Sequence, residues 1–134
     1  MGSPAIGNLS FLRTLNLSDN GLTGSIPASL GRLRRLHALN LSHNGFSGEL
    51  PANLSSCTSL KILSLQSNHL HGYIPHELGD RLTLLKRLEL VDDNFIGTIP
   101  ASMGNLPSMS ILDLAEMNNG IHHNIHVLQN THNT

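Results

Sequence analysis

The chain offers few residues whose type and spacing could support catalysis. Asp92 and Asp93 are adjacent carboxylates, a residue type used for acid and base catalysis. A helix would place His122 and His126 on one face, where two imidazoles could bind a metal ion. No carboxylate or cysteine completes that set, and the sequence has no nucleophile elbow or phosphate-binding loop. We therefore expect no catalytic residue, no metal site and no cofactor.

A four-residue phrase sets the organisation of the chain. It reads Gly-Ser-Ile-Pro at 24–27, Gly-Glu-Leu-Pro at 48–51, Gly-Tyr-Ile-Pro at 72–75 and Gly-Thr-Ile-Pro at 97–100, so its prolines are 24, 24 and 25 residues apart. A fixed period of this size is typical of stacked-repeat proteins. Because one such unit is too small to bury its leucines alone, we predict that each unit packs against its neighbours.

Each unit also carries a Leu-x-Leu segment followed by an amide or carboxyl residue. The alternation of apolar and polar residues predicts a short, half-buried strand. Asparagine at the next turn can donate to and accept from backbone groups of its own and adjacent units. We expect a structural ladder at these positions, which are Asn20, Asn44, Asn68 and Asp93. An ionised carboxylate cannot donate, so the Asp93 rung should be weaker.

The repeat boundaries follow from this framework. We place repeats at about 9–32, 33–56, 57–81 and 82–105, with a partial fifth at 106–117, all within one domain of residues 1–117. Residues 118–134 form an Asn- and His-rich tail that we expect to be poorly ordered, or to cap the fifth unit through Ile121, Ile125 and Leu128. A frameshift or an alternative splice end would explain the abrupt change at Met117.

The phrases Asn-Gly-Leu-Thr-Gly-Ser-Ile-Pro at 20–27 and Asn-His-Leu-His-Gly-Tyr-Ile-Pro at 68–75 resemble the plant extracellular class of leucine-rich repeats. The resemblance covers residues 6–117 and implies an α/β repeat solenoid. Its expected form is a right-handed superhelix with a parallel concave sheet, short 3₁₀ segments on the convex side and a second small sheet near the Gly-x-Ile-Pro phrase. The extra residue near Asp80 and Arg81 should form a bulge in the convex loop.

The same resemblance, which extends to the ectodomains of plant receptor-like kinases, implies a non-enzymatic module. It would bind a protein or peptide, and a co-receptor, in immune or developmental signalling at the cell surface. Two alternatives remain open at the level of sequence. One is an inhibitor of a cell-wall-degrading enzyme. The other is a truncated decoy or nonfunctional fragment that associates through uncapped ends, because the chain shows no cysteine-paired cap, signal peptide, membrane helix or kinase motif.

The expected ligand surface lies between the framework leucines, where strand side chains point to the concave side. One edge of this surface is basic, and the opposite edge becomes acidic towards the C-terminal repeats. Such a pattern could orient a peptide, although a solvated repeat surface would look similar. The candidate residues are Lys61, Ser64, Gln66, Lys86, Arg87, Glu89, Val91, Asp92 and Asp113.

Four Asn-Leu-Ser sequons mark candidate glycosylation sites at Asn8, Asn16, Asn40 and Asn53. A glycan at Asn16 or Asn40 would move the ligand site towards repeats three to five. We expect Phe46 and Phe95 in the core, Phe11 partly buried and Tyr73 at the surface.

The overall composition argues against two function classes. The net charge of −1, from 8 basic and 9 acidic residues, does not favour nucleic-acid binding. No apolar run reaches the length of about 20 residues that a membrane helix needs. The single cysteine, Cys57, replaces a framework leucine and should be a buried small apolar residue, with a reactive or intermolecular thiol as the alternative.

Overall fold

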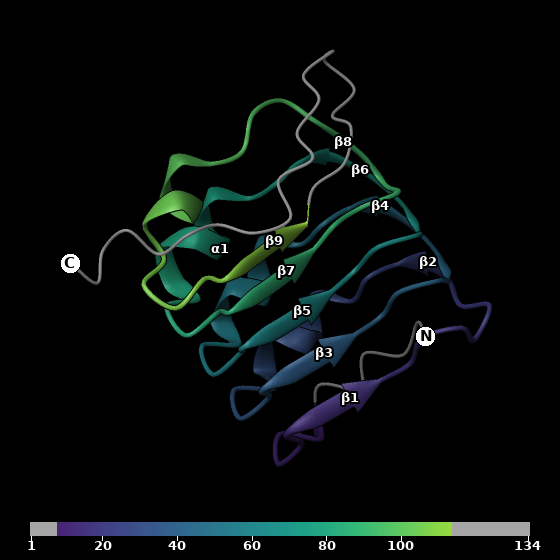
Figure 1. The fold of residues 1–134 in the computed structure, drawn as a ribbon. Coiled ribbons are helices and arrows are strands. Elements are labelled where there is room, and N and C mark those ends of the chain that lie inside the picture. The colour runs from purple at the N-terminus through teal and green to yellow at the C-terminus, as the bar shows by residue number, and fades with distance from the viewer. Residues whose placement is uncertain (1–7, 114–134) are drawn as a thin grey trace.

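The computed structural model describes residues 8–113, which form a solenoid of stacked coils (Figure 1). Each complete coil contains a strand of one sheet, a strand of a second sheet and a short helix. The strands of the larger sheet are β1 (Thr14–Asn16), β3 (Ala38–Asn40), β5 (Ile62–Ser64), β7 (Arg87–Glu89) and β9 (Ile111–Asp113). The strands of the smaller sheet are β2 (Thr23–Ser25), β4 (Gly45–Glu49), β6 (His69–Tyr73) and β8 (Asn94–Ile96).

Both sheets are parallel, and their strand order follows the order of the repeats. In the larger sheet the middle leucines of successive strands are paired, so Leu15, Leu39 and Leu63 lie in one row. The same register continues through Leu88 to Leu112. One repeat therefore occupies the same place in the sheet as the next, as the sequence period predicts.

The core is a continuous apolar column between the two sheets and the helices. Leu39, Leu63 and Leu88 have no exposed surface, and the same holds for framework leucines such as Leu36 and Leu60. Phe46 and Phe95 are buried in this column, in agreement with the sequence prediction. Packing of each coil on the next supplies the apolar burial that one coil cannot provide alone.

Short helices form the side of the solenoid opposite the larger sheet. Three are 3₁₀ helices, η2 (Ala28–Arg32), η3 (Ala52–Ser56) and η4 (Ala101–Asn105). The third coil instead has an α-helix, α1 (His76–Arg81). The expected bulge near Asp80 is therefore wrong. The extra residue lengthens the helix to six residues, which converts a 3₁₀ segment into α-helical hydrogen bonding from Leu82 to Leu78.

The recurring glycine and proline fulfil different backbone requirements. Gly24, Gly48, Gly72 and Gly97 have φ between 81° and 84°, a region that side-chain-bearing residues rarely adopt. The proline of each phrase precedes a helix with extended backbone angles, and its carbonyl accepts a hydrogen bond from an N–H inside that helix. The phrase thus ends the strand of the smaller sheet and begins the helix.

The first coil differs from the inner ones because no described coil covers it. Leu12, Leu15, Leu17 and Leu22 are only partly buried. Phe11 has 64% of its surface exposed, so its expected partial burial is wrong.

None of the helices within residues 8–113 is long and apolar enough to cross a bilayer. The Asn/His-rich tail, its histidines and its proposed cap lie outside the described residues.

Candidate binding surface

The solvent side of the five-stranded sheet, here called the open face, carries residues that alternate with the buried leucines. The first row contains Thr14, Ala38, Ile62 and Arg87, and the second contains Asn16, Asn40, Ser64 and Glu89, each in direct register. The backbone of β9 continues this register, with Ile111 paired to Arg87 and Asp113 paired to Glu89. Adjacent parallel strands lie about 4.8 Å apart, so side chains of neighbouring rows and strands can contact one ligand.

The residues just before the strands form the basic edge of the open face. Backbone N–H groups of Lys61 and Lys86 each donate to the carbonyl of the preceding coil, at 2.8 Å, which extends the sheet's bonding by one residue. Lys86 and Arg87 are exposed and Lys61 is half-buried. Within residues 8–113, the ion pairs are confined to His76 with Glu77 and Asp80. The three basic side chains therefore have no carboxylate partner in this part of the chain.

The opposite end of the strands is acidic in the fourth coil. Asp92 is exposed and has a left-handed φ of 63°. Glu89 is half-buried, and its Oε1 accepts a hydrogen bond from the Ser64 hydroxyl at 2.9 Å. Ser64 itself is only 4% exposed, and its hydroxyl is engaged with the Glu89 carboxylate. Its direct contact with a ligand stays a prediction.

Three further candidates lie beyond these rows or at the end of the sheet. Gln66 and Val91 are half-buried, and their carbonyls accept the N–H groups of His43 and Ser67 from the preceding coils. The Gln66 side-chain oxygen is buried without a hydrogen-bond partner in the described region. Asp113 ends β9, which places it next to Glu89 in register. The candidates thus lie across β5, β7 and β9, before, within and after these strands.

The asparagine ladder holds adjacent coils together. Asn44 Oδ1 accepts the N–H groups of Asn20 and Leu22 at 2.9 and 3.0 Å, and Asn68 Oδ1 accepts that of Phe46 at 3.0 Å. Asn68 Nδ2 donates to the carbonyl oxygens of Leu41 and Leu65. One amide side chain therefore satisfies backbone groups of two coils at the turn, where the strand no longer does so.

The fourth rung is chemically different. Asp93 Oδ1 accepts the Leu70 N–H at 3.0 Å, but Oδ2 is buried with no partner in the described region. Burial raises the pKa of Asp93 to about 7, an effect that the backbone N–H groups of Leu70 and Asn68 partly oppose and the charge of Asp92 increases. Its environment therefore differs from that of an ordinary surface aspartate, whose ionised form is solvated by water.

The four sequon asparagines lie at different places on the solenoid. Asn8, Asn16 and Asn53 are exposed, while Asn40 is half-buried. Asn40 Oδ1 accepts both the N–H and the hydroxyl of Ser42, and Asn16 makes the same pair of bonds with Ser18. Asn53 lies on the helical side, away from the open face. The glycosylation of all four remains a prediction.

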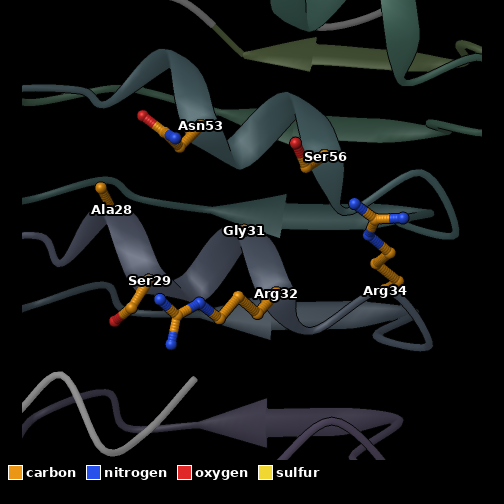
Figure 2. A pocket seen from close by; sticks show the side chains of 7 residues that line it. All are labelled: Ala28, Ser29, Gly31, Arg32, Arg34, Asn53 and Ser56. Carbon is orange, nitrogen blue, oxygen red and sulfur yellow. The ribbon is translucent and has the colours of Figure 1, made fainter. Parts of the chain in front are cut away.

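Sequence analysis did not anticipate a polar groove on the helical side (Figure 2). A cavity of about 350 Å³ lies between η2 and η3, and a second of about 220 Å³ lies between η3 and α1. The first is lined by Ala28, Ser29, Gly31, Arg32, Arg34, Asn53 and Ser56. Gly31 lets the two helices approach closely, since a Cβ there would collide with the Asn53 carbonyl. Small residues and arginines alternate in residues 28–34, which could have indicated the groove. The 24-residue period alone does not indicate it.

In the smaller sheet, a side chain of one coil lies over the phrase glycine of the next coil. The Glu49 side chain lies over Gly72, where an added Cβ would be 2.8 Å from Glu49 Cγ. The Tyr73 ring lies over Gly97 in the same way, with a Cβ distance of 2.7 Å, although 66% of Tyr73 is exposed. Tyr73 therefore combines a supporting contact with the surface position that the sequence predicts.

Cys57 and the histidines show no catalytic arrangement in the described region. Cys57 is fully buried, burial raises the pKa of its thiol to about 11, and its Sγ lies 3.1 Å from the Leu30 carbonyl oxygen. This environment suits an unreactive buried thiol. Within residues 8–113 no three His, Cys, Asp or Glu side chains form a group that could hold a metal ion.

Three segments of the chain match the family description Leucine Rich Repeat, at residues 11–33, 35–57 and 59–80. These segments coincide with the first three coils, and together they span just over half of the 134 residues. The chain belongs to the leucine-rich repeat family. Its parallel sheets and short 3₁₀ helices are the α/β repeat fold that the sequence predicts.

The solved structures similar to this chain include plant receptor ectodomains. PEPR1 with AtPEP1 is 44% identical, with a TM-score of 0.78 over 81% of this chain and 15% of PEPR1. The ectodomain of the membrane receptor kinase GASSHO1/SCHENGEN3 from Arabidopsis thaliana, with CASPARIAN STRIP INTEGRITY FACTOR 2, is 43% identical, with a TM-score of 0.82 over 86% of this chain and 14% of that one.

A third relative, the Arabidopsis receptor kinase HAESA with the peptide hormone IDA and the co-receptor SERK1, is 32% identical, with a TM-score of 0.80. The match covers 85% of this chain and 19% of HAESA. The chain therefore resembles a leucine-rich repeat receptor kinase ectodomain and spans less than a fifth of each of these relatives. The curated proteins contain no significant match to it.

Proposed function

We propose that this chain is a non-enzymatic recognition module that binds a peptide or protein segment on its open face. The binding zone lies across β5, β7 and β9, with Lys61, Lys86 and Arg87 on one side and Glu89 and Asp92 on the other. A ligand bound across the strands would meet a basic and an acidic edge at fixed separation, which sets its orientation as well as its affinity.

The observation that carries this proposal is that three basic residues are neighbours at one edge of the open face. Lys86 and Arg87 both donate their backbone N–H groups to the Lys61 carbonyl, which brings the three residues together on adjacent strands. Charge-assisted hydrogen bonds from such groups to a ligand are stronger than neutral ones. The exposed Ile62, with 39% of its surface accessible, supplies an apolar contact beside them.

The relatives support the biological setting of the proposal. The HAESA structure holds both a peptide hormone and a co-receptor, and GASSHO1/SCHENGEN3 is a plant membrane receptor kinase. By analogy, we propose that the present chain acts in an extracellular receptor-type context, in immune or developmental signalling, with a co-receptor as second partner. The comparable repeats make up only a small part of each relative, so the ligand of this chain has to be identified directly.

The test is a binding assay of the full chain against an array of synthetic peptides from secreted plant precursors, and against the SERK1 ectodomain. A charge-reversal variant Lys61→Glu/Lys86→Glu/Arg87→Glu should lose binding by about tenfold or more, since one lost charged contact is about 1.4 kcal/mol. The control, Arg32→Glu/Arg34→Glu, reverses two charges in the groove on the helical side and should bind normally.

The proposal is wrong if both variants bind equally, or if the helical-side variant alone loses binding. Circular dichroism of each variant should remain that of the unchanged chain, because exposed substitutions away from structural contacts seldom alter stability by more than about 0.5 kcal/mol. Capture of a cell-wall polygalacturonase instead of any peptide would also overturn it, in favour of an inhibitor.

A further inference from the structure

The inner rungs of the asparagine ladder show what a complete rung requires. Asn44 accepts from the preceding coil through Oδ1, and its Nδ2 donates to the carbonyl oxygens of Leu17, Leu41 and Ser42 at 3.0–3.1 Å. Asn68 repeats this arrangement one coil later. Each complete rung thus combines one acceptor atom with one donor atom, and the donor faces carbonyl oxygens of its own and the preceding coil.

Asp93 preserves the acceptor half of the rung and alters the donor half. Its Oδ1 binds the Leu70 N–H as Asn68 Oδ1 binds that of Phe46. Its Oδ2 takes the place of the donating Nδ2, is buried and has no partner within the described region. By the register of the repeats, the carbonyls that correspond to Leu41 and Leu65 around Asn68 are those of Leu65 and Leu90. An ionised Oδ2 would therefore face carbonyl oxygens, which repel it.

We propose that Asp93 is a proton-dependent rung that controls how firmly the fourth coil stacks on the third. With a proton on Oδ2, the carboxyl donates to the Leu65 or Leu90 carbonyl and reproduces the bonds of an asparagine. Without it, the junction contains a buried negative charge and an unsatisfied carbonyl. The stack is then weakest between β6 and β8 and at the turn that follows β7, where Asp92 reaches the open face.

The surroundings of Asp93 favour its neutral form. Burial is the largest cause of its raised pKa, and the charge of Asp92 acts in the same direction. From the third coil Asp93 meets the backbone N–H groups of Asn68 and Leu70, while the titratable groups on β6, His69 and His71, are exposed. Residues 114–134 lie outside the described structure.

The sign of the pH dependence follows from linkage. The folded pKa of Asp93, about 7, exceeds the ordinary value of 3.8, so the folded chain binds the proton more tightly than the unfolded chain. The stabilisation from the protonated rung is fully present below about pH 4. It is lost progressively as the pH rises from about 4 to about 7, and the chain is less stable above that range.

The experiment is urea unfolding of the full chain at pH 5 and pH 8, compared among the unchanged protein, Asp93→Asn and Asp92→Asn. For the unchanged protein we expect the unfolding equilibrium constant to be about ten- to hundredfold larger at pH 8, because each unit of pKa difference is tenfold. Asp93→Asn should remove this difference and raise the urea midpoint at pH 8. Asp92→Asn makes the same chemical change at an exposed carboxyl and should keep most of the difference, because burial is the larger cause of the raised pKa of Asp93.

Histidines titrate in the same range and require a control. Hydrogen bonding to Asp80 raises the pKa of His76, so its pairing also stabilises more at low pH than at high pH. His76→Gln is therefore introduced into both the unchanged and the Asp93→Asn backgrounds. The Asp93-dependent difference should persist when His76 is absent.

A second readout does not depend on unfolding. Carbon-13 NMR titration of the Asp93 carboxyl carbon should give a midpoint near the raised pKa of about 7, well above the ordinary aspartate value of 3.8. The proposal is overturned if the Asp93 carboxyl titrates near pH 4, or if Asp93→Asn leaves the pH dependence of stability unchanged. Loss of folding in Asp93→Asn at pH 5 would overturn it as well, because asparagine is the residue used by the neighbouring rungs.

Discussion

The interior of the solenoid and its open face follow opposite rules within the same strands. On β5, Leu63 is fully buried and occupies a position where every coil has leucine, whereas its neighbour Ile62 is 39% exposed at a position held by Thr14, Ala38 or Arg87 elsewhere. The interior positions hold the same residue type in every coil because each coil must pack against the next. The residues of the open face vary from coil to coil because solvent imposes no such packing, so they can determine which ligand binds.

The residues of the asparagine ladder share one property with each of these two regions. They are polar, yet their hydrogen bonds to adjacent coils constrain them almost as tightly as the leucines. The one departure, Asp93, still accepts from the coil before it and lacks only the donor. A single atom in the solenoid wall can therefore change without loss of the repeat pattern.

The largest effect should come from breaking the interior while leaving the open face intact. Leu63→Ala removes a fully buried side chain from the middle of the stack and should lower the free energy of unfolding by about 2–5 kcal/mol. Ile62→Ala, one residue earlier on the same strand, should cost about 0.5 kcal/mol or less. Urea unfolding measures both. Equal costs would contradict the division between the two faces.

Breaking a ladder rung should have the next largest effect. Asn68→Ala leaves the Phe46 N–H and carbonyl oxygens of two coils without partners, at a site that is 4% exposed. We expect a loss of about 2–3 kcal/mol, because unsatisfied buried polar groups are costly. Asn20→Ala alters the exposed first rung, where water replaces the lost bonds, and should cost clearly less. A comparable loss at Asn20 would show that burial does not set the importance of a rung.

Crowding the helical side should have the smallest effect of the three. A Cβ at Gly79 of α1 would collide with the Ser102 hydroxyl and lie 2.8 Å from the Met103 backbone nitrogen. Gly79→Ala should therefore destabilise the chain by about 1–2 kcal/mol, as overpacking does elsewhere. In the matched control, Gly104→Ala, no atom lies within 4 Å of the added Cβ. Thermal unfolding that ranks Gly104→Ala as the more damaging change would refute close helix packing.

Much of this fold could be predicted from the sequence because the same residue types recur at equivalent positions of several repeats. The Leu-x-Leu strands, the glycine with positive φ, the proline before each helix and the buried Phe46 all follow from local chemistry. The helical form of residues 76–81 could not be predicted, since the extra residue could equally form a bulge or join the helix. In the structure it joins the helix, which packs against both η3 and η4. The burial of Ser64 likewise depends on Glu89, which is 25 residues away.

The candidate site was only partly accessible to sequence reasoning. The rows of the open face follow from the alternation of residues along each strand. The sequence therefore predicts that Lys61, Lys86 and Arg87 lie at the basic edge. The lack of carboxylate partners for these residues became visible only in three dimensions. The groove between η2 and η3 was missed because its lining residues, among them Arg32 and Asn53, follow no period that marks them as neighbours.

The sequence by itself determined that this chain stacks, where its strands and turns lie and which family it belongs to, because a period of about 24 residues leaves each unit no way to bury its leucines except against the next. Only the tertiary structure decided which polar atoms find partners. Hydrogen bonds and burial depend on atoms contributed by adjacent coils. Only the stacked arrangement shows that Asn68 is satisfied, whereas Asp93 has one buried oxygen without a partner among residues 8–113.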